Sequence, residues 1–220
     1  MTTTRLILIR HGESKTTVAG IIGGHRSCGG LSPLGRQQAE RLRDRWVAHR
    51  DFTPDVLLSS QFSRARETAE IIAPALDSLS IGEDAGWGEH DPGPECDGLS
   101  YDDFVTRHGG GWWEGDPFGT SFPGGETIAS FQFRVGQALR RTIDEHAGKT
   151  IVVACHGGVV DAVMRFTLKM PPTGSFQIHT LNTSITEFEL IEPHMWRLLR
   201  YNDTAHLAGL PRSTVSLQSN

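Results

Sequence analysis

The chain has 220 residues, of which 37% are hydrophobic and 21% are charged, and its formal net charge is −5. This composition is typical of a globular protein, and the acidic balance argues against nucleic acid as a partner because phosphate backbones bind basic surfaces. No apolar run approaches the roughly 18 residues of a membrane span or resembles a signal-peptide core, so we expect a cytoplasmic protein without a membrane partner.

The first predicted element is a buried strand at residues 6–9, LILI. A continuous rather than alternating apolar run suits a strand that is buried on both faces of a parallel sheet. A helix is then predicted to begin at Pro33, with Ser32 as its N-cap, and to end near His49. Its apolar stripe consists of Ala39, Leu42 and Trp46.

The run DVLLS at residues 55–59 predicts a second buried strand, and Ser63 has the character of an N-cap for the helix that follows. Pro74 is expected to kink or end this helix. The apolar stripe of the helix consists of Ala65, Ala69, Ile72 and Leu76. A short strand is predicted at residues 80–82.

Residues 86–125 show no regular periodicity and are rich in Gly, Pro and Trp. Connections of this length are unusual inside a compact domain and often form lids or binding loops. We therefore expect a lid-like insertion here, with one short helix at residues 100–107.

Regular patterns return after this insertion. A long amphipathic helix is predicted at residues 128–143, and TIVVAC at residues 150–155 is the strongest buried strand of the chain. Gly157 opens a further helix. Two more strands, at residues 184–190 and 195–201, are expected to form a hairpin.

Strands that alternate with helices predict an α/β fold, a three-layer α/β/α sandwich with a mostly parallel central sheet. We expect residues 1–210 to form a single domain and the polar residues 211–220 to form a disordered tail. In such sheets the ligand site lies beyond the carboxyl ends of the strands.

Charged and polar residues follow three of the predicted strands. Arg10 and His11 follow the first strand. Arg64 lies at the start of the helix after DVLLS, and His156 follows TIVVAC. If the three strands are parallel neighbours, two histidines and two arginines converge at one edge of the sheet.

This set of residues suits phosphoryl transfer. Two guanidiniums pair the oxygens of a phosphate, and the helix N-terminus at Gly157 also favours an anion. A neutral imidazole can act as a nucleophile, while a second imidazole donates hydrogen bonds to the transferring group. A carboxyl group near the phosphate would supply the proton for the leaving oxygen. Glu89 is the best placed carboxyl group in sequence order, and Asp91 and Glu95 are its rivals.

The chain resembles the histidine phosphatase superfamily, also called the phosphoglycerate mutase-like family. The resemblance rests on the ordered motifs LIRHGES, SSQFSRARETA and VVACHGG, with a Glu in the loop after the second motif. Later pieces that fit are GLSPLGRQQA, FPGGET, NTSIT and WRLLRYNDTAHL, so the likeness covers roughly residues 4–207. It implies a phosphoglycerate mutase-like fold and a reaction that needs no metal and no organic cofactor.

The resemblance also assigns roles to single residues. It implies that His11 is the nucleophile and becomes a phosphohistidine, and that Glu89 protonates the leaving group. Gly157 is implied as a donor of a backbone N–H. The residues implied to bind the phosphoryl group are Arg10, Arg64 and His156.

Three stretches depart from the family pattern, and one of them, GEHDPGPECDG, resembles the family's acid loop but lacks its common W-E-G ending. Many members carry an Asn a few residues after R-H-G-E, and Thr17 occupies that position here, as a candidate phosphate contact. The stretch GGHRSCGG differs from the usual one, so Gly23 and His25 are candidate neighbours of the substrate.

The predicted function is a metal-independent phosphomonoester hydrolase that acts on a small phosphorylated metabolite and releases inorganic phosphate. The alternatives are a phosphomutase of the phosphoglycerate mutase type and a non-catalytic protein that binds a phosphorylated ligand. A homodimer is left open.

Simpler readings of single residues compete with these roles. Arg64 at a helix surface would pair with Glu67 or Glu70. Glu13 is expected to be a local hydrogen-bond partner rather than an acid catalyst, and Cys155 a small buried residue.

The three cysteines lie at positions 28, 96 and 155, an odd number without a C-x-x-C spacing. They indicate neither a disulfide framework nor a zinc site, although a single Cys28–Cys96 bridge stays open. The histidines show no metal-ligand spacing, so no metal is expected.

Overall fold

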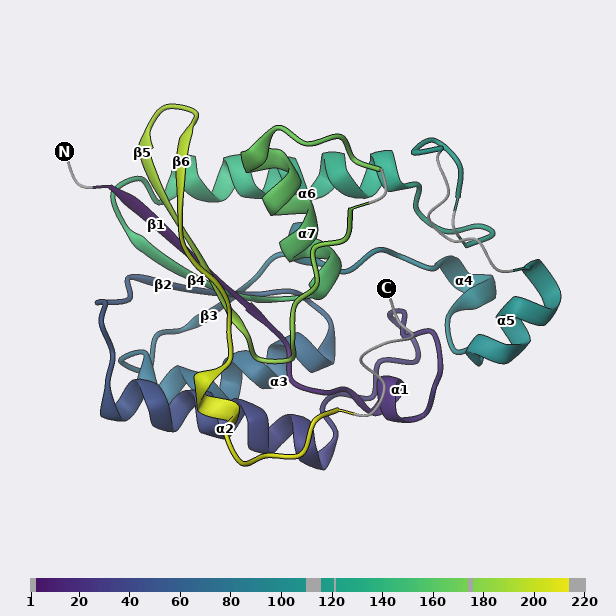
Figure 1. Ribbon diagram of the computed structural model, residues 1–220, viewed down its shortest axis with the longest axis horizontal. Coiled ribbons are helices and arrows are strands. Elements are labelled where there is room, and N and C mark those ends of the chain that lie inside the picture. Colours follow the sequence, from purple (N-terminus) through teal and green to yellow (C-terminus); the bar gives the residue numbers. More distant parts are fainter. Residues whose placement is uncertain (1–2, 110–115, 121, 174–175, 214–220) are drawn as a thin grey trace.

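A six-stranded sheet forms the centre of the protein in the computed structural model, which describes residues 3–109, 116–120, 122–173 and 176–213 (Figure 1). The strand order is β3-β2-β4-β1-β5-β6. The strands are β1 (Thr4–Arg10), β2 (Val56–Ser59), β3 (Ile81–Glu83), β4 (Thr150–Cys155), β5 (Ile185–Glu192) and β6 (Met195–Asp203). The first four run parallel, and β5 runs antiparallel to both of its neighbours, which confirms the predicted hairpin of β5 and β6.

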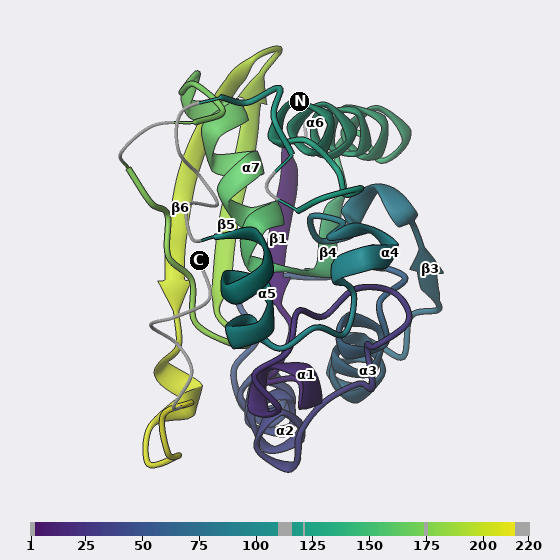
Figure 2. The ribbon, with the colours of Figure 1, turned by 90° about the vertical axis from the view of Figure 1, so that its right-hand side faces the viewer.

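Helices cover both faces of the sheet. In Figures 1 and 2, α2 and α3 lie on one face and α6 and α7 on the other, so the predicted three-layer α/β/α architecture is confirmed. The α-helices are α1 (Lys15–Val18), α2 (Pro33–Ala48), α3 (Ser63–Ile72), α4 (Gly93–Cys96), α5 (Tyr101–His108), α6 (Ile128–Glu145) and α7 (Gly157–Leu168). The short 3-10 helices are η1 (Ala73–Ala75), η2 (Ala85–Trp87) and η3 (Ala205–Leu207).

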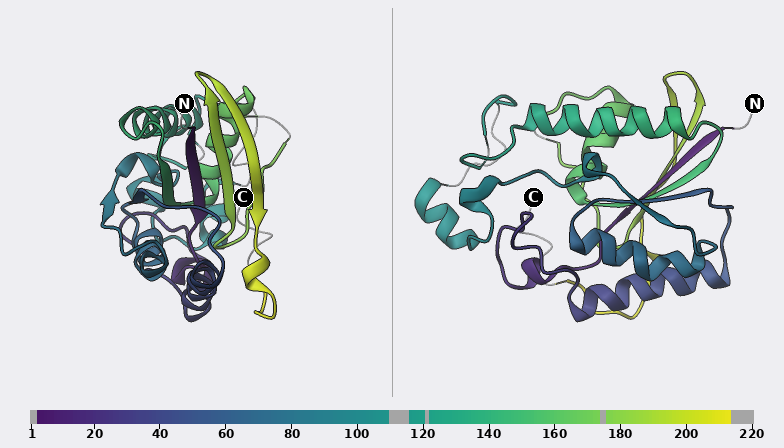
Figure 3. Two further views of the ribbon diagram at one scale, coloured as in Figure 1. Left: turned by 90° about the vertical axis from the view of Figure 1, so that its left-hand side faces the viewer. Right: turned by 180° about the vertical axis from the view of Figure 1, so that it is seen from behind.

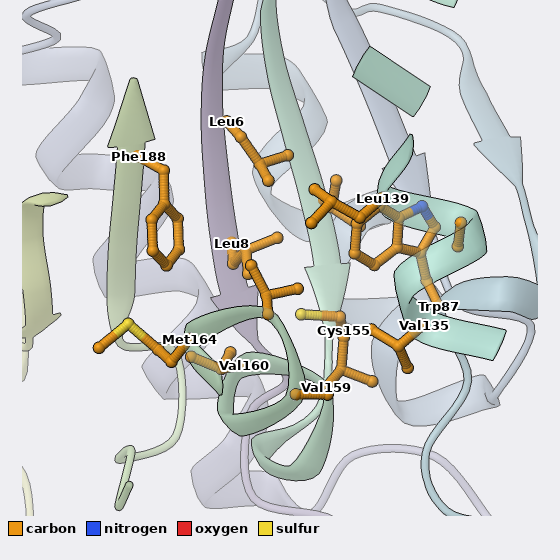
Figure 4. Close-up of a cluster of buried hydrophobic side chains, with 14 of the residues drawn as sticks. Leu6, Leu8, Trp87, Val135, Leu139, Cys155, Val159, Val160, Met164 and Phe188 are labelled. Atoms are coloured by element: carbon orange, nitrogen blue, oxygen red, sulfur yellow. The ribbon is translucent and has the colours of Figure 1, made fainter. Parts of the chain in front are cut away.

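Strand β1 is buried on both faces, as its continuous apolar run predicts. Leu6 and Leu8 pack toward α6 and α7, in the cluster that Figure 4 shows. Ile7 and Ile9 point the other way, toward α2 and α3. All four side chains are fully buried, and side chains that alternate between two packed layers fix the register of the strand.

The local signals for helix ends are confirmed at two places and wrong at one. Ser32 caps α2 by accepting a hydrogen bond from the N–H of Gly35. The α3 helix ends at Ile72, and Pro74 lies in the 3-10 turn that follows. Ser63 is the first helical residue rather than the N-cap, because Phe62 occupies the cap position.

The 86–125 stretch contains more regular structure than its sequence predicts. In addition to the expected helix α5, it includes the short helix α4. Both pack onto a small apolar cluster of Ile22, Cys96, Phe104 and Phe122. In Figure 3, α4 and α5 lie apart from the sheet. Residues 110–115 and 121 of the expected insertion lie outside the described residues.

The remaining expectations concern cysteines, membranes and the tail. All three cysteines are free, so the Cys28–Cys96 bridge that the sequence left open is absent. Within the described ranges, no helix combines the length and the apolar character that crossing a bilayer requires. Residues 214–220 of the expected tail lie outside the described residues.

Candidate active site

The site is built at the edge of the sheet where β1, β4 and β2 end side by side. Arg10 of β1 pairs with Cys155 of β4, and Ser59 of β2 pairs with Ala154. Because parallel neighbours end at the same edge, the residues after each strand are brought together. These residues are His11, His156 and the Ser60–Arg64 segment.

Arg64 lies between the two histidine rings. Its Nε donates to Nε2 of His11 at 3.1 Å and to Nδ1 of His156 at 3.3 Å. The two ring centroids are 5.1 Å apart. Arg64 is 4% exposed and does not pair with Glu67 or Glu70, which instead contact Arg36 and Arg66. The helix-surface reading of Arg64 is therefore wrong.

The hydrogen bonds fix the tautomer of His11. A guanidinium can only donate, so Nε2 carries the lone pair that accepts from Arg64. Nδ1 lies 2.6 Å from the carbonyl oxygen of Gly12, which can only accept, so Nδ1 carries the proton. Nε2 is thus the ring atom with nucleophilic character.

His156 is fixed in a similar way by a residue that the sequence analysis missed. Its Nδ1 accepts from Arg64, and its Nε2 donates to Oγ of Ser60 at 2.8 Å. Ser60 is fully buried and also accepts from the N–H of Phe62. The only sequence signal for Ser60 was its place after a strand end, in SSQFSR.

Both imidazoles are held neutral. Burial, followed by the positive charges of Arg64 and Arg10, lowers the pKa of His11 well below its ordinary value. Burial and Arg64 also lower the pKa of His156, with His11 and Arg10 as smaller causes. A neutral His11 keeps its Nε2 lone pair at physiological pH.

Arg10 belongs to the same cluster of side chains at the sheet edge. Its Nη1 donates to the carbonyl of Thr180, whereas its buried Nε has no partner among the described residues. Burial lowers its pKa, Glu89 raises it and Arg64 lowers it. A Cβ added at Gly157 would lie 3.5 Å from the Arg10 guanidinium, so the start of α7 passes directly beside this side chain.

Glu89 lies against the N-terminus of α7. Its Oε2 accepts from the N–H of Gly158 at 3.1 Å, and its Oε1 accepts from the N–H of His90 at 3.0 Å. A Cβ at position 158 would come within 2.3 Å of Oε1, so this approach requires glycine. The Glu89 carboxylate also raises the pKa of Arg10, so the two side chains interact electrostatically.

Arg134 of α6 holds the segment that carries Glu89. Its Nη2 donates to the carbonyl of Glu89 at 3.1 Å and to the carboxylate of Glu126 at 2.8 Å. Its Nη1 donates to three further carbonyls of this segment, those of Ala85, Gly86 and Gly88. No sequence pattern indicates this role, because an Arg on an amphipathic helix is ordinarily a surface residue.

The rival carboxylates have other surroundings. Asp91 accepts from the N–H of Gly93 at 2.9 Å and so closes a local turn. Glu95 is exposed on α4. Glu13 is buried and accepts from Oγ of Ser32 at 2.7 Å, as its predicted local role requires.

The 17–28 segment contributes neighbours of Arg64. The carbonyl of Gly23 and Sγ of Cys28 each lie 3.3 Å from Nη1 of Arg64. His25 stacks on the ring of Phe62 at 4.1 Å between centroids. The hydroxyl of Thr17 lies 2.8 Å from that of Ser14, in the cap of α1.

Metal-ligating side chains do not gather in the described part of the chain. No group of three or more His, Cys, Asp or Glu residues there could hold a metal ion.

Comparisons with known proteins find similar sequences over nearly the whole chain. The family model of the histidine phosphatase superfamily (branch 1) matches residues 6–204. Phosphoglycerate mutase-like protein 4 of Arabidopsis thaliana is 30% identical over 92% of this chain and 86% of its own length. A metal-independent phosphoserine phosphatase of the same plant is 26% identical over 94% of this chain and 84% of its own.

A solved structure is similar over nearly the whole chain. It is a phosphoserine phosphatase mutant from Entamoeba histolytica in complex with phosphoserine. The TM-score is 0.74 at 27% identity, and the match covers 93% of this chain and 99% of the other.

Proposed function

Since the chain belongs to the histidine phosphatase superfamily, we propose that it is a phosphomonoester hydrolase that works through a phosphohistidine intermediate on His11. One observation carries the proposal. A single buried guanidinium, Arg64, contacts the unprotonated Nε2 of His11 and the Nδ1 of His156. This geometry supports the assignment of His11 as the nucleophile and of Arg64 and His156 as phosphate-binding groups.

In the first step, the Nε2 lone pair of His11 forms a bond to phosphorus and the ester P–O bond breaks. The Nδ1 proton stays on the ring and is stabilised by the carbonyl of Gly12. Arg10 and Arg64 neutralise the equatorial oxygens, as phosphoryl transfer requires. When the phosphate binds as a monoanion, Nδ1 of His156 takes up its proton and donates it in a hydrogen bond to the transferring group, and the proton leaves again with inorganic phosphate.

Glu89 gives its proton to the leaving oxygen in this first step, so the alcohol departs neutral. In the second step, water attacks the phosphohistidine and passes a proton to Glu89. Inorganic phosphate leaves, and His11 regains its free Nε2. Every group in this cycle belongs to the chain, so we expect no requirement for a metal.

The substrate proposed is a small phosphorylated metabolite. Two of the similar proteins are phosphoserine phosphatases, which makes phosphoserine the first compound to test. The runner-up function is a phosphomutase, since the relative from Arabidopsis thaliana that is 30% identical is named phosphoglycerate mutase-like. The two functions share the phosphohistidine and differ in whether water or a substrate hydroxyl accepts the phosphoryl group.

The experiment is a phosphate-release screen over phosphomonoesters with wild-type, His11→Ala and Glu89→Gln proteins, each with and without a chelator. We expect release by the wild type, none by His11→Ala, and no effect of the chelator. A phosphoenzyme that is labile in acid and stable in base would identify phosphohistidine. Full turnover by His11→Ala would refute the proposal. Conversion of 3- to 2-phosphoglycerate with little free phosphate would favour the mutase.

A further inference from the structure

The backbone of His11 is held by a segment far away in the sequence. As the chain leaves β1, the carbonyls of Arg10 and His11 need hydrogen-bond donors. The N–H of Thr183 lies 2.8 Å from the carbonyl oxygen of Arg10 and 3.4 Å from that of His11. The side-chain amide of Asn182 donates to the carbonyl of His11 at 3.0 Å. On the opposite side, the N–H of His11 donates to the carbonyl of Cys155 at 2.9 Å.

Thr183 makes these contacts from an unusual backbone conformation. Its φ is +53°, and it is the β-branched residue among the described non-glycine residues with positive φ. Such a conformation is a real outlier for a β-branched side chain and persists only where the surroundings hold it. Thr183 is fully buried, so its surroundings are protein on every side.

The hydroxyl of Thr183 shows what holds it. Oγ1 donates to the carbonyl of Asn182 at 2.8 Å, and it lies 3.0 Å from Nε2 of His206. Because the single hydroxyl proton is used on the carbonyl, Nε2 of His206 is the donor to Oγ1. Nδ1 of His206 is then the acceptor and faces Nη1 of Arg45 at 3.5 Å. Arg45 is in turn fixed by both carboxylate oxygens of Asp203, at 3.0 and 2.6 Å.

We infer that Thr183, braced by His206, is a positioning residue for His11. The hydrogen bonds run in one direction, from Arg45 to His206, from His206 to the Thr183 hydroxyl and from that hydroxyl to the carbonyl of Asn182. The N–H of the same Asn182–Thr183 peptide group then donates to the carbonyls on either side of the nucleophile. A rigid peptide group fixes the Cα–Cβ direction of His11 and thereby the line along which Nε2 approaches phosphorus. The inference rests on the proposed function, because it assigns Nε2 of His11 the attack.

The test compares variants that keep or lose the hydroxyl. Thr183→Val keeps the β-branched shape and loses the hydroxyl, whereas Thr183→Ser keeps the hydroxyl. Since a displacement near 1 Å can cost on the order of 100-fold in rate, we expect Thr183→Val to lower kcat by at least about tenfold, with KM within about twofold. Thr183→Ser should restore most of kcat. Thr142→Val, which removes an equally buried hydroxyl from α6, should leave kcat unchanged.

His206 gives a second pair, for the case that Thr183→Val does not fold. His206→Ala removes the brace and should lower kcat with KM unchanged, while His206→Gln, whose amide can donate to Thr183, should recover part of it. Melting temperatures are measured for all variants. The inference is overturned if kcat stays within about twofold of the wild type in both Thr183→Val and His206→Ala. It is also overturned if Thr183→Ser lowers kcat as much as Thr183→Val does.

The same assay separates this inference from the proposed function. If His11→Ala is inactive while Thr183→Val and His206→Ala keep full kcat, the positioning role alone fails. If His11→Ala retains the wild-type activity, the proposed function fails and the positioning role fails with it.

Discussion

Replacing Gly158 with alanine tests whether Glu89 is the proton donor. The new Cβ would lie 2.3 Å from Oε1 and 3.2 Å from Cδ of Glu89. Because non-bonded heavy atoms settle at about 3.5 Å or more, the carboxylate must move by about 1 Å. The two shortest contacts are with the end of a flexible side chain, whereas the third, 3.3 Å from Cζ of Phe131, needs a shift of only a few tenths of an ångström. We therefore expect α7 to keep its place and Glu89 to give way.

The expected cost falls on catalysis and not on stability. A displacement of this size lowers the rate of the step that needs the proton by about 100-fold, or about 2.7 kcal/mol of barrier. Ala in place of a helical Gly restricts the unfolded chain and contributes about 0.4–1 kcal/mol of stability. The melting temperature of Gly158→Ala should therefore stay close to that of the wild type.

The assay compares two leaving groups. An alkyl phosphate such as phosphoserine needs its leaving oxygen protonated, whereas an aryl phosphate with an acidic phenol does not. The loss of kcat in Gly158→Ala should be large for the first and small for the second, as in Glu89→Gln. Gly136→Ala is the matched control, because its Cβ would meet the ring of Phe166 at an ordinary 3.6 Å. Equal losses for both leaving groups, or none for the alkyl phosphate, would refute the assignment of Glu89.

Three further outcomes follow from the geometry. Arg64→Lys, which removes the Nε–H that contacts both imidazoles and the planar guanidinium proposed to pair phosphate oxygens, should lower kcat/KM by about 10²- to 10³-fold in steady-state kinetics. Near-normal kinetics would contradict the role assigned to Arg64. Alkylation by iodoacetamide should inactivate the enzyme through the half-buried Cys28, 3.3 Å from Arg64, and an active Cys28→Ser variant should resist it. Burial, together with Arg45, lowers the pKa of His206 to about 4. Below pH 6.5 His206 therefore binds a proton in the unfolded chain but not in the folded one. The free energy of unfolding should fall by up to about 3 kcal/mol between pH 6.5 and 4. Urea titrations should show a flatter pH dependence for His206→Gln, and an unchanged slope would contradict this origin.

The residues at the sheet edge were predictable because each lies directly after its strand in the sequence. The apolar run at residues 6–9 is continuous and ends at Arg10, and TIVVAC ends at His156 in the same manner. Parallel pairing then needs no further signal to bring the two ends together, because such strands end at one edge. Ser32 was found for the same reason, since a cap and its first-turn N–H lie three residues apart.

The residues that hold the site residues in place were not predictable, because each contacts a residue far away in the sequence. Arg134 reaches Glu89 across 45 residues, and Ser60 reaches His156 across 96. Neither residue stands out by type, because an Arg on a helix and a Ser after a strand are ordinary. Thr183 is similar: a positive φ at a β-branched residue contradicts its local propensity, so only the tertiary contacts account for it. The supports that hold a site in place are thus the part that sequence patterns describe least.

The two guanidiniums have effects that cannot be separated. In the proposed mechanism, Arg10 and Arg64 supply the positive charge that a phosphate dianion needs, and the charges of the same two residues help to lower the pKa of the buried His11. A protonated His11 would add a third cation beside them and would lose the Nε2 lone pair. Removing either positive charge should therefore weaken phosphate binding and also shift the acid limb of the rate profile upward, because His11 would protonate more easily. Burial is the largest cause of the lowered pKa of His11 and the two guanidiniums add to it, so the proposed nucleophile depends both on the depth at which the strand ends are buried and on the charges proposed to bind phosphate.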